Sequence, residues 1–115
     1  MSDQALIDPN SAVDFLIACA PKHAKAKAER IYLEQFRKSK KALLMQAASV
    51  AGFKTAASQE VEAYAHPEYL ELLLALQAAT EVEENARWKM VEAQARIEVW
   101  RSQEASNRNQ DRAAR

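Results

Sequence analysis

Basic side chains are concentrated in one part of this chain, between residues 22 and 41. That stretch holds eight Lys or Arg and only two Glu. Five of the basic residues would lie along one face of a helix, where they could follow a phosphate backbone. These five are Lys27, Arg30, Arg37, Lys38 and Lys41. They are the candidate nucleic-acid contacts of the sequence.

The same basic stretch has an acidic counterpart further along the chain. Residues 58–84 hold seven Glu and no Lys or Arg. If the chain folds back at residues 52–57, Lys41 comes near Glu68 and the two stretches become complementary flanks of a helix pair. Because the sixteen basic and sixteen acidic residues cancel, no global field favours nucleic acid. We therefore favour the intramolecular match over nucleic-acid binding.

Side chains suited to catalysis or metal binding are few. With a single Gly in the chain, a Gly-rich phosphate loop is excluded. Glu62 and His66 have the spacing of two ligands on one helical face, but the Glu-x-x-His motifs of di-iron bundles are absent. The single cysteine, Cys19, is interpreted as a small buried hydrophobe. We predict no catalytic residue, no metal, no cofactor and no small-molecule substrate, and hence no enzyme.

The side chains with chemistry must be positioned by helices, since the stretch from Pro67 to about residue 108 contains no Gly and no further Pro. Strong helix formers fill it. A row at alternating 4,3 spacing runs along it, which is typical of a helix-packing seam. The row consists of Leu72, Leu76, Ala79, Glu83, Ala86, Met90, Ala93, Ile97 and Trp100. Glu83 is its one charged member, and Arg30 or Arg87 is expected to pair with it.

A second long helix is predicted over residues 22–51, with a short helix over 12–20 before it. Pro21 is expected to separate the two, and residues 1–11 form a lead-in. Gly52 stops the second helix. Thr55 or Ser58 then caps a return helix over 58–108, which is kinked near Pro67, and residues 109–115 form a frayed tail. The 4,3 row of the 22–51 helix is Tyr32, Phe36, Ser39, Leu43, Gln46 and Val50.

The return helix is longer than its partner, so its distal part needs other contacts. The excess is some 15 Å or more at 1.5 Å per residue. Apolar residues lie on two nearly opposite sides of this part, and Trp is favoured at interfaces. One short helix cannot cover both sides, so we expect self-association into a dimer or larger bundle. The predicted protein interface is Trp88, Met90, Val91, Ala95, Ile97, Val99 and Trp100.

Composition narrows the class of protein further. One Gly and three Pro are too few for the turns of an all-β or α/β fold. One Cys excludes an internal disulfide and fits a reducing cytosol. No signal peptide is evident, and no apolar run is long enough to span a bilayer. We predict one all-α domain, an antiparallel helical hairpin with a short N-terminal helix, in the cytoplasm and without membrane contact.

Three stretches resemble small helical proteins of tailed bacteriophages and prophages: A-E-R-I-Y-L-E-Q-F-R-K-S-K-K-A-L-L-M, H-P-E-Y-L-E-L-L and A-R-I-E-V-W-R-S-Q-E-A-S-N-R. The resemblance covers roughly residues 24–108. It implies a coiled-coil hairpin in a bacterial host cytoplasm, among functions of phage DNA recombination and replication. The stretch A-A-S-V-A-G-F-K-T-A-A also resembles the helix-turn-helix of phage terminase small subunits, over about 30 residues around Gly52.

The sequence thus predicts a non-enzymatic, oligomeric helical interaction protein. The resemblance adds a setting, an accessory factor in DNA recombination or replication with a protein partner there. Direct nucleic-acid binding by the basic face of residues 22–51 is the alternative, and a helix-turn-helix around Gly52 is less favoured.

Overall fold

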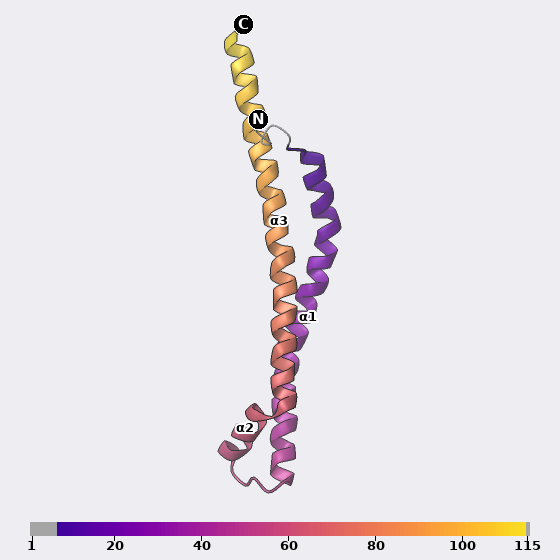
Figure 1. Ribbon diagram of the computed structural model, residues 1–115, viewed down its shortest axis with the longest axis vertical. Coiled ribbons are helices and arrows are strands. Elements are labelled where there is room, and N and C mark those ends of the chain that lie inside the picture. Colours follow the sequence, from indigo (N-terminus) through magenta and orange to yellow (C-terminus); the bar gives the residue numbers. More distant parts are fainter. Residues whose placement is uncertain (1–6, 115) are drawn as a thin grey trace. The chain divides into compact units, whose positions relative to one another are not determined.

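The computed structural model describes residues 7–114, which form three α-helices and no strand. These are α1 (Pro9–Val50), α2 (Ala56–Ala65) and α3 (Pro67–Ala114) (Figure 1). Two of them are long, with 42 and 48 residues. The prediction of an all-α chain with two long helices is therefore confirmed.

Helix α1 is continuous through Pro21, so the predicted break between residues 12–20 and 22–51 is wrong. A proline inside a helix removes one hydrogen bond and strains the preceding turn. Buried residues on both sides of Pro21, such as Cys19 and Leu44, favour one continuous helix in spite of that cost. The lead-in is also shorter than predicted, because Pro9 suits a first helical position and the Asn10 N–H donates to Asp8 Oδ1 at 3.0 Å. Residues 1–6 of the predicted lead-in lie outside the described residues.

Gly52 ends α1 as predicted. It has φ 109°, a left-handed conformation that favours glycine. The Phe53 N–H donates to the Ala48 carbonyl at 3.1 Å, and the Gly52 N–H donates to the Ser49 carbonyl at 3.2 Å. This pair of bonds is the Schellman motif, which satisfies the last carbonyls of a helix.

Helix α2 begins at a capping box. Thr55 Oγ1 accepts from the Ser58 N–H at 3.1 Å, and the Thr55 N–H donates to Ser58 Oγ at 3.3 Å. The predicted cap at Thr55 is confirmed, and the two bonds satisfy donors that the first helical turn leaves open.

A break, rather than the predicted kink, separates α2 from α3. His66 is extended, with φ −66° and ψ 136°, because a following proline disfavours the helical conformation. The His66 Nδ1 atom then accepts from the Glu68 N–H at 3.1 Å and caps α3. The predicted frayed tail is also wrong up to residue 114, where α3 ends, since Ala, Arg and Gln there are good helix formers.

The chain divides into two compact units. Unit 1 consists of Met1–Ala24 and Glu84–Arg115, and unit 2 consists of Lys25–Glu83. The core of unit 2 is Leu44, Ala63 and Tyr69, with Met45 and Leu73 packed against it. Ala63 is fully buried, so α2 approaches its neighbours closely.

The inner row of α3 is the row that the sequence predicts. Every member is buried or half-buried: Leu72, Leu76, Ala79 and Glu83 in unit 2, and Ala86, Met90, Ala93, Ile97 and Trp100 in unit 1. This part of the prediction is confirmed.

The predicted row of α1, by contrast, lies on the outside. Tyr32, Phe36, Ser39, Leu43, Gln46 and Val50 are all exposed. The inward side of α1 in unit 2 instead carries Ala26, Arg30, Leu33, Arg37, Lys41, Leu44 and Ala48. Arg30 and Lys41 occupy this side because Glu83 of α3 and Glu60 of α2 offer them partners.

Candidate interaction surfaces

Unit 2 contains an ion cluster inside the helix pair. Glu83 is 7% exposed. Its carboxylate accepts from Arg30 Nε, and Arg30 Nη2 lies 3.3 Å from Glu83 Oε2. Arg30 Nη1 also donates to Glu34 Oε1 at 2.9 Å. The hydrogen bond to Glu83 has the larger effect on the pKa of Arg30, and the one to Glu34 the smaller. Both raise it, because they stabilise the charged form of the guanidinium.

Of the two arginines expected to pair with Glu83, Arg30 is the one that does so. Arg87 bonds Glu84 instead, three residues earlier on α3, at 2.9 Å. A charge pair within a seam fixes the register of two helices, because any other register leaves a buried charge unpaired.

Other members of the basic stretch are also paired. Lys40 lies 3.4 Å from Glu68, and Lys41 lies 3.7 Å from Glu60. The Lys41 Nζ atom is also 4.7 Å from the centre of the Tyr64 ring. The pKa of Lys41 is raised, chiefly by its interaction with the Tyr64 side chain and further by the charge of Glu60.

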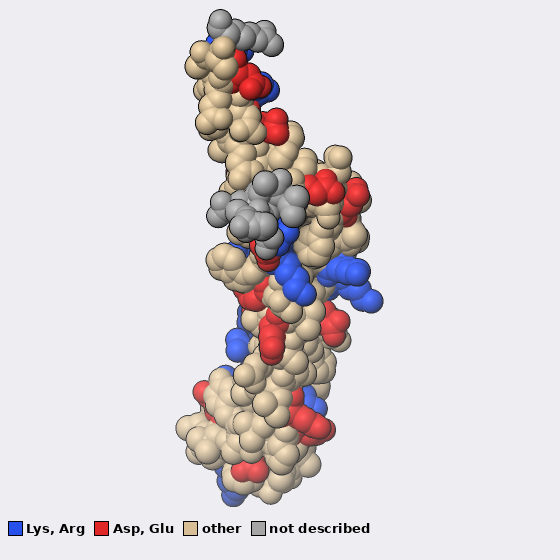
Figure 2. Space-filling view, turned by 45° about the horizontal axis from the view of Figure 1, so that its top comes forward, with Lys and Arg blue, Asp and Glu red and all other residues tan. Residues whose placement is uncertain are grey.

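The five candidate nucleic-acid contacts therefore do not form one exposed face. Lys27 and Lys38 are exposed, whereas Arg30, Arg37 and Lys41 are half-buried on the inward side of α1. On the face of the molecule in Figure 2, acidic and basic side chains are interspersed. On that face, the described side chains give a phosphate backbone no continuous track of a single sign.

The charge of α2 does not fit the helix-turn-helix resemblance around Gly52. Helix α2, which follows that turn, contains Glu60 and Glu62 and no Lys or Arg. A recognition helix lies against phosphates and base edges, where Arg and Lys are the common contacts. The charge of α2 opposes that role.

The predicted interface residues of α3 divide between two sides of the helix in unit 1. Met90, Ile97 and Trp100 belong to the half-buried inner row. The other four residues are exposed and follow 3,4,4 spacing, so they share one outward stripe; we name it the Trp88 face. The Trp88 face consists of Trp88, Val91, Ala95 and Val99.

Charged residues surround the Trp88 face. Trp88 itself is 58% exposed, and the Arg87 guanidinium lies 4.5 Å from the centre of its ring. Ion pairs within α3 accompany it, Arg96 with Glu92 at 3.0 Å and Arg101 with Glu98 at 3.1 Å. An apolar centre with a charged rim is the usual anatomy of a protein-binding surface.

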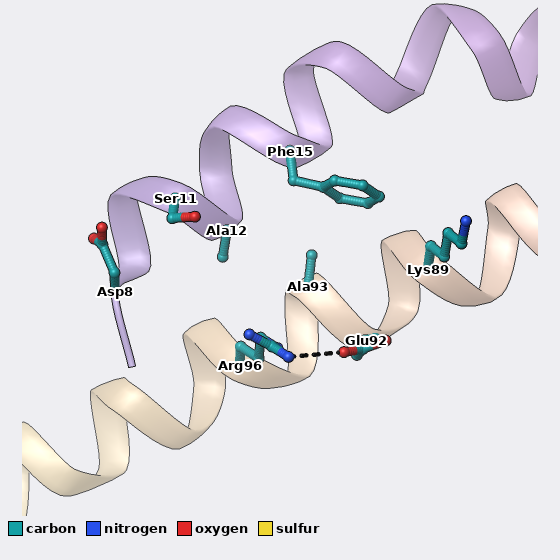
Figure 3. Close-up of a pocket in the computed structure, with 8 residues that line it drawn as sticks. All are labelled: Asp8, Ser11, Ala12, Phe15, Lys89, Glu92, Ala93 and Arg96. Carbon is teal, nitrogen blue, oxygen red and sulfur yellow. Dashed lines mark hydrogen bonds and ion pairs between the residues drawn. The ribbon is translucent and has the colours of Figure 1, made fainter. Parts of the chain in front are cut away.

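Unit 1 also has a groove between α1 and α3, with a volume of about 490 Å³. Figure 3 shows Phe15 directed from α1 toward α3, and Ala12 facing Ala93. The Glu92–Arg96 pair crosses its α3 wall. Ala12 and Ala93 are small and buried, so they let the two helices approach each other. The bulkier side chains beside them hold the helices apart and form the walls of the groove. The groove itself had no signal in the sequence, although Ala93 in its lining belongs to the predicted inner row of α3.

Metal-ligating side chains do not gather into a cluster among residues 7–114. In that range no three His, Cys, Asp or Glu side chains lie close enough to hold a metal ion. Cys19 is buried, as predicted, and its Sγ atom lies 3.8 Å from the Ala86 carbonyl oxygen. The buried Nε2 atom of His23 has no hydrogen-bond partner. Within the described chain, no helix has the length and apolar character needed to cross a bilayer.

Comparison with protein-family models, with curated proteins and with solved structures found no match for this chain.

Proposed function

We propose that this chain is a non-enzymatic, oligomeric helical interaction protein that binds another protein through the Trp88 face. The observation that carries the proposal is the exposed row of Trp88, Val91, Ala95 and Val99 inside a rim of charged side chains. Tryptophan and arginine are the side chains that contribute most to binding at such surfaces. The spacing of the row fits a partner helix that lies along α3.

The setting of this function is a proposal that the phage resemblance alone supports. In it, the chain is an accessory factor in DNA recombination or replication and meets its protein partner in the bacterial cytoplasm. The complete pairing of α1 with α3 as an antiparallel hairpin belongs to the same proposal. Within unit 2, the Arg30–Glu83 and Lys40–Glu68 contacts support that direction.

The Trp88 face is tested with one disruptive variant and one matched control. Trp88→Asp is compared with Val61→Asp, because Val61 is similarly exposed, at 69%, but lies on α2. We expect a protein from the source cell to co-purify in stoichiometric amount with the wild type and with Val61→Asp. Its affinity for Trp88→Asp should fall by about 30-fold or more, the effect of losing one dominant interface residue.

Two measurements complete this test. In a Trp100→Phe background Trp88 is the only tryptophan, so its fluorescence reports on the proposed face alone. Binding of the purified partner should shift the emission to shorter wavelength and protect it from acrylamide. If the partner binds Trp88→Asp as tightly as the wild type, the Trp88 face is not the binding surface.

Nucleic-acid binding by the basic stretch is less well supported, since two exposed lysines of the five remain for it. At low salt, where phosphate contacts are strongest, we expect no change in the fluorescence anisotropy of labelled single- or double-stranded DNA. Saturable binding that Lys27→Glu with Lys38→Glu abolishes would instead establish the alternative.

A further inference from the structure

The outward side of α1 carries no charged residue along the row from Tyr32 to Val50. We call the exposed residues on this side the α1 outer face. They are Tyr32, Gln35, Phe36, Ser39, Ala42, Leu43, Gln46, Ala47, Ser49 and Val50. Leu43 is 56% and Val50 is 88% exposed. Two lysines flank this face: Lys40, which is held in an ion pair with Glu68, and Lys38, which is exposed.

This distribution differs from that of an ordinary surface helix, which turns its charges to water and its apolar stripe inward. Here Arg30, Arg37 and Lys41 are on the inward side, whereas Tyr32 and Leu43 are on the outside. The outward row keeps the 4,3 spacing of a coiled-coil seam over 19 residues, from Tyr32 to Val50. An exposed apolar seam of this length is typical of a surface that another helix covers.

The absence of charge indicates which helix covers it. Two copies of an uncharged face can meet across a twofold axis without bringing like charges together. Ser39, Gln46 and Tyr32 each carry both a hydrogen-bond donor and an acceptor, so each can pair with residues of an identical face. Charge depletion is typical of homodimer interfaces.

We propose that a second copy of this chain packs on the α1 outer face, so that two α1 helices form a twofold seam of Tyr32, Phe36, Leu43 and Val50. The proposal rests on the oligomeric part of the proposed function and names its surface. It leaves the Trp88 face of each copy free for the protein partner.

The test is the molar mass of purified full-length chains, measured by light scattering across the micromolar range. We expect a wild-type mass of twice 12.9 kDa. Leu43→Glu should weaken the dimer by about 100-fold or more, because it buries an unpaired carboxylate from each copy. Leu74→Glu is the matched control, since Leu74 lies on α3 of the same unit and is 66% exposed, and it should remain dimeric.

Each other outcome has a defined meaning. A dimer that persists in Leu43→Glu, or that only Trp88→Asp dissociates, overturns the inference and leaves the proposed oligomer in place. A wild-type monomer overturns both this inference and the oligomeric part of the proposed function, whereas the partner-binding test of Trp88 stands separately. Circular dichroism confirms that the variants are folded, and Leu43→Gln, which adds no charge, should weaken the dimer in the same direction if Leu43→Glu unfolds.

Discussion

Leu43 and Leu44 are adjacent in the sequence but point in directions about 100° apart on α1, which allows a sharp test of how α1 is oriented. Leu44 is 7% exposed in the core of unit 2, and Leu43 is 56% exposed. Both residues are replaced by alanine, one at a time. The two variants therefore change the same chemistry in two different environments.

The expected losses of stability differ by a factor of about three. Truncation of a buried leucine to alanine removes three carbons, worth about 2.4 kcal/mol at 0.8 kcal/mol per buried methylene, and the cavity raises the loss toward about 3 kcal/mol. Leu43 buries less than half of its surface in one chain, so Leu43→Ala should cost about 1 kcal/mol or less. The better helix propensity of alanine reduces that cost further.

Urea unfolding followed by circular dichroism measures both values. At low protein concentration, where the monomer dominates, Leu44→Ala should be the more destabilised variant. At high concentration the wild type should gain stability by dimerisation, and Leu43→Ala should lose much of that gain whereas Leu44→Ala keeps it. If Leu43→Ala costs as much as Leu44→Ala at low concentration, α1 is rotated by about 100°, and the sequence-based row is the inner one after all.

Three further outcomes follow from the local contacts. Thr55→Ala should lower the stability of unit 2 by about 1 kcal/mol, the usual cost of a lost helix cap, as measured by thermal unfolding. Arg30→Met should destabilise the fold more than Arg87→Met does, because it leaves the buried Glu83 carboxylate without its arginine; equal urea midpoints for the two variants would disagree with the buried pair. The interaction with Tyr64 raises the pKa of Lys41, so the stability that it contributes is complete below about pH 10.5 and is lost as the pH rises through the folded value. The free energy of unfolding of Tyr64→Phe should therefore lie below that of the wild type at neutral pH and approach it at alkaline pH.

The inner row of α3 could be predicted because its pattern has one interpretation. Leu72, Leu76 and Ile97 recur at helical spacing, and charged residues separate them on the other sides. Glu83 stood out as the single charge in that row, which was enough to point to an arginine partner. The helix stop at Gly52 and the helix cap at Thr55 could also be predicted, because backbone geometry and capping chemistry depend on few neighbours.

The orientation of α1 could not be predicted from the same rule. The rule places the largest apolar residues inward, and it selects Tyr32, Phe36 and Leu43. In the structure, the glutamates opposite α1 bring Arg30 and Lys41 to the inward side instead. The acidic composition of residues 58–84 is the available signal, but composition alone does not say whether the charges match between flanks or between inner faces.

The predicted helix boundaries at the two prolines are wrong for a related reason. Pro21 and Pro67 are the same residue type, yet α1 continues through the first and the chain breaks before the second. Around Pro21, packing on both sides outweighs the cost of one proline. At Pro67 the extended His66 and its hydrogen bond to Glu68 make the break favourable, and local sequence does not distinguish the two cases.

Self-association of the full chain through the α1 outer face is the central claim about this protein. The decisive measurement is the molar mass of the wild type and of Leu43→Glu, determined by light scattering at matched micromolar concentrations. We predict a dimer for the wild type and a monomer of 12.9 kDa for Leu43→Glu. A wild type that remains monomeric at every concentration, or a variant that remains dimeric, would contradict it.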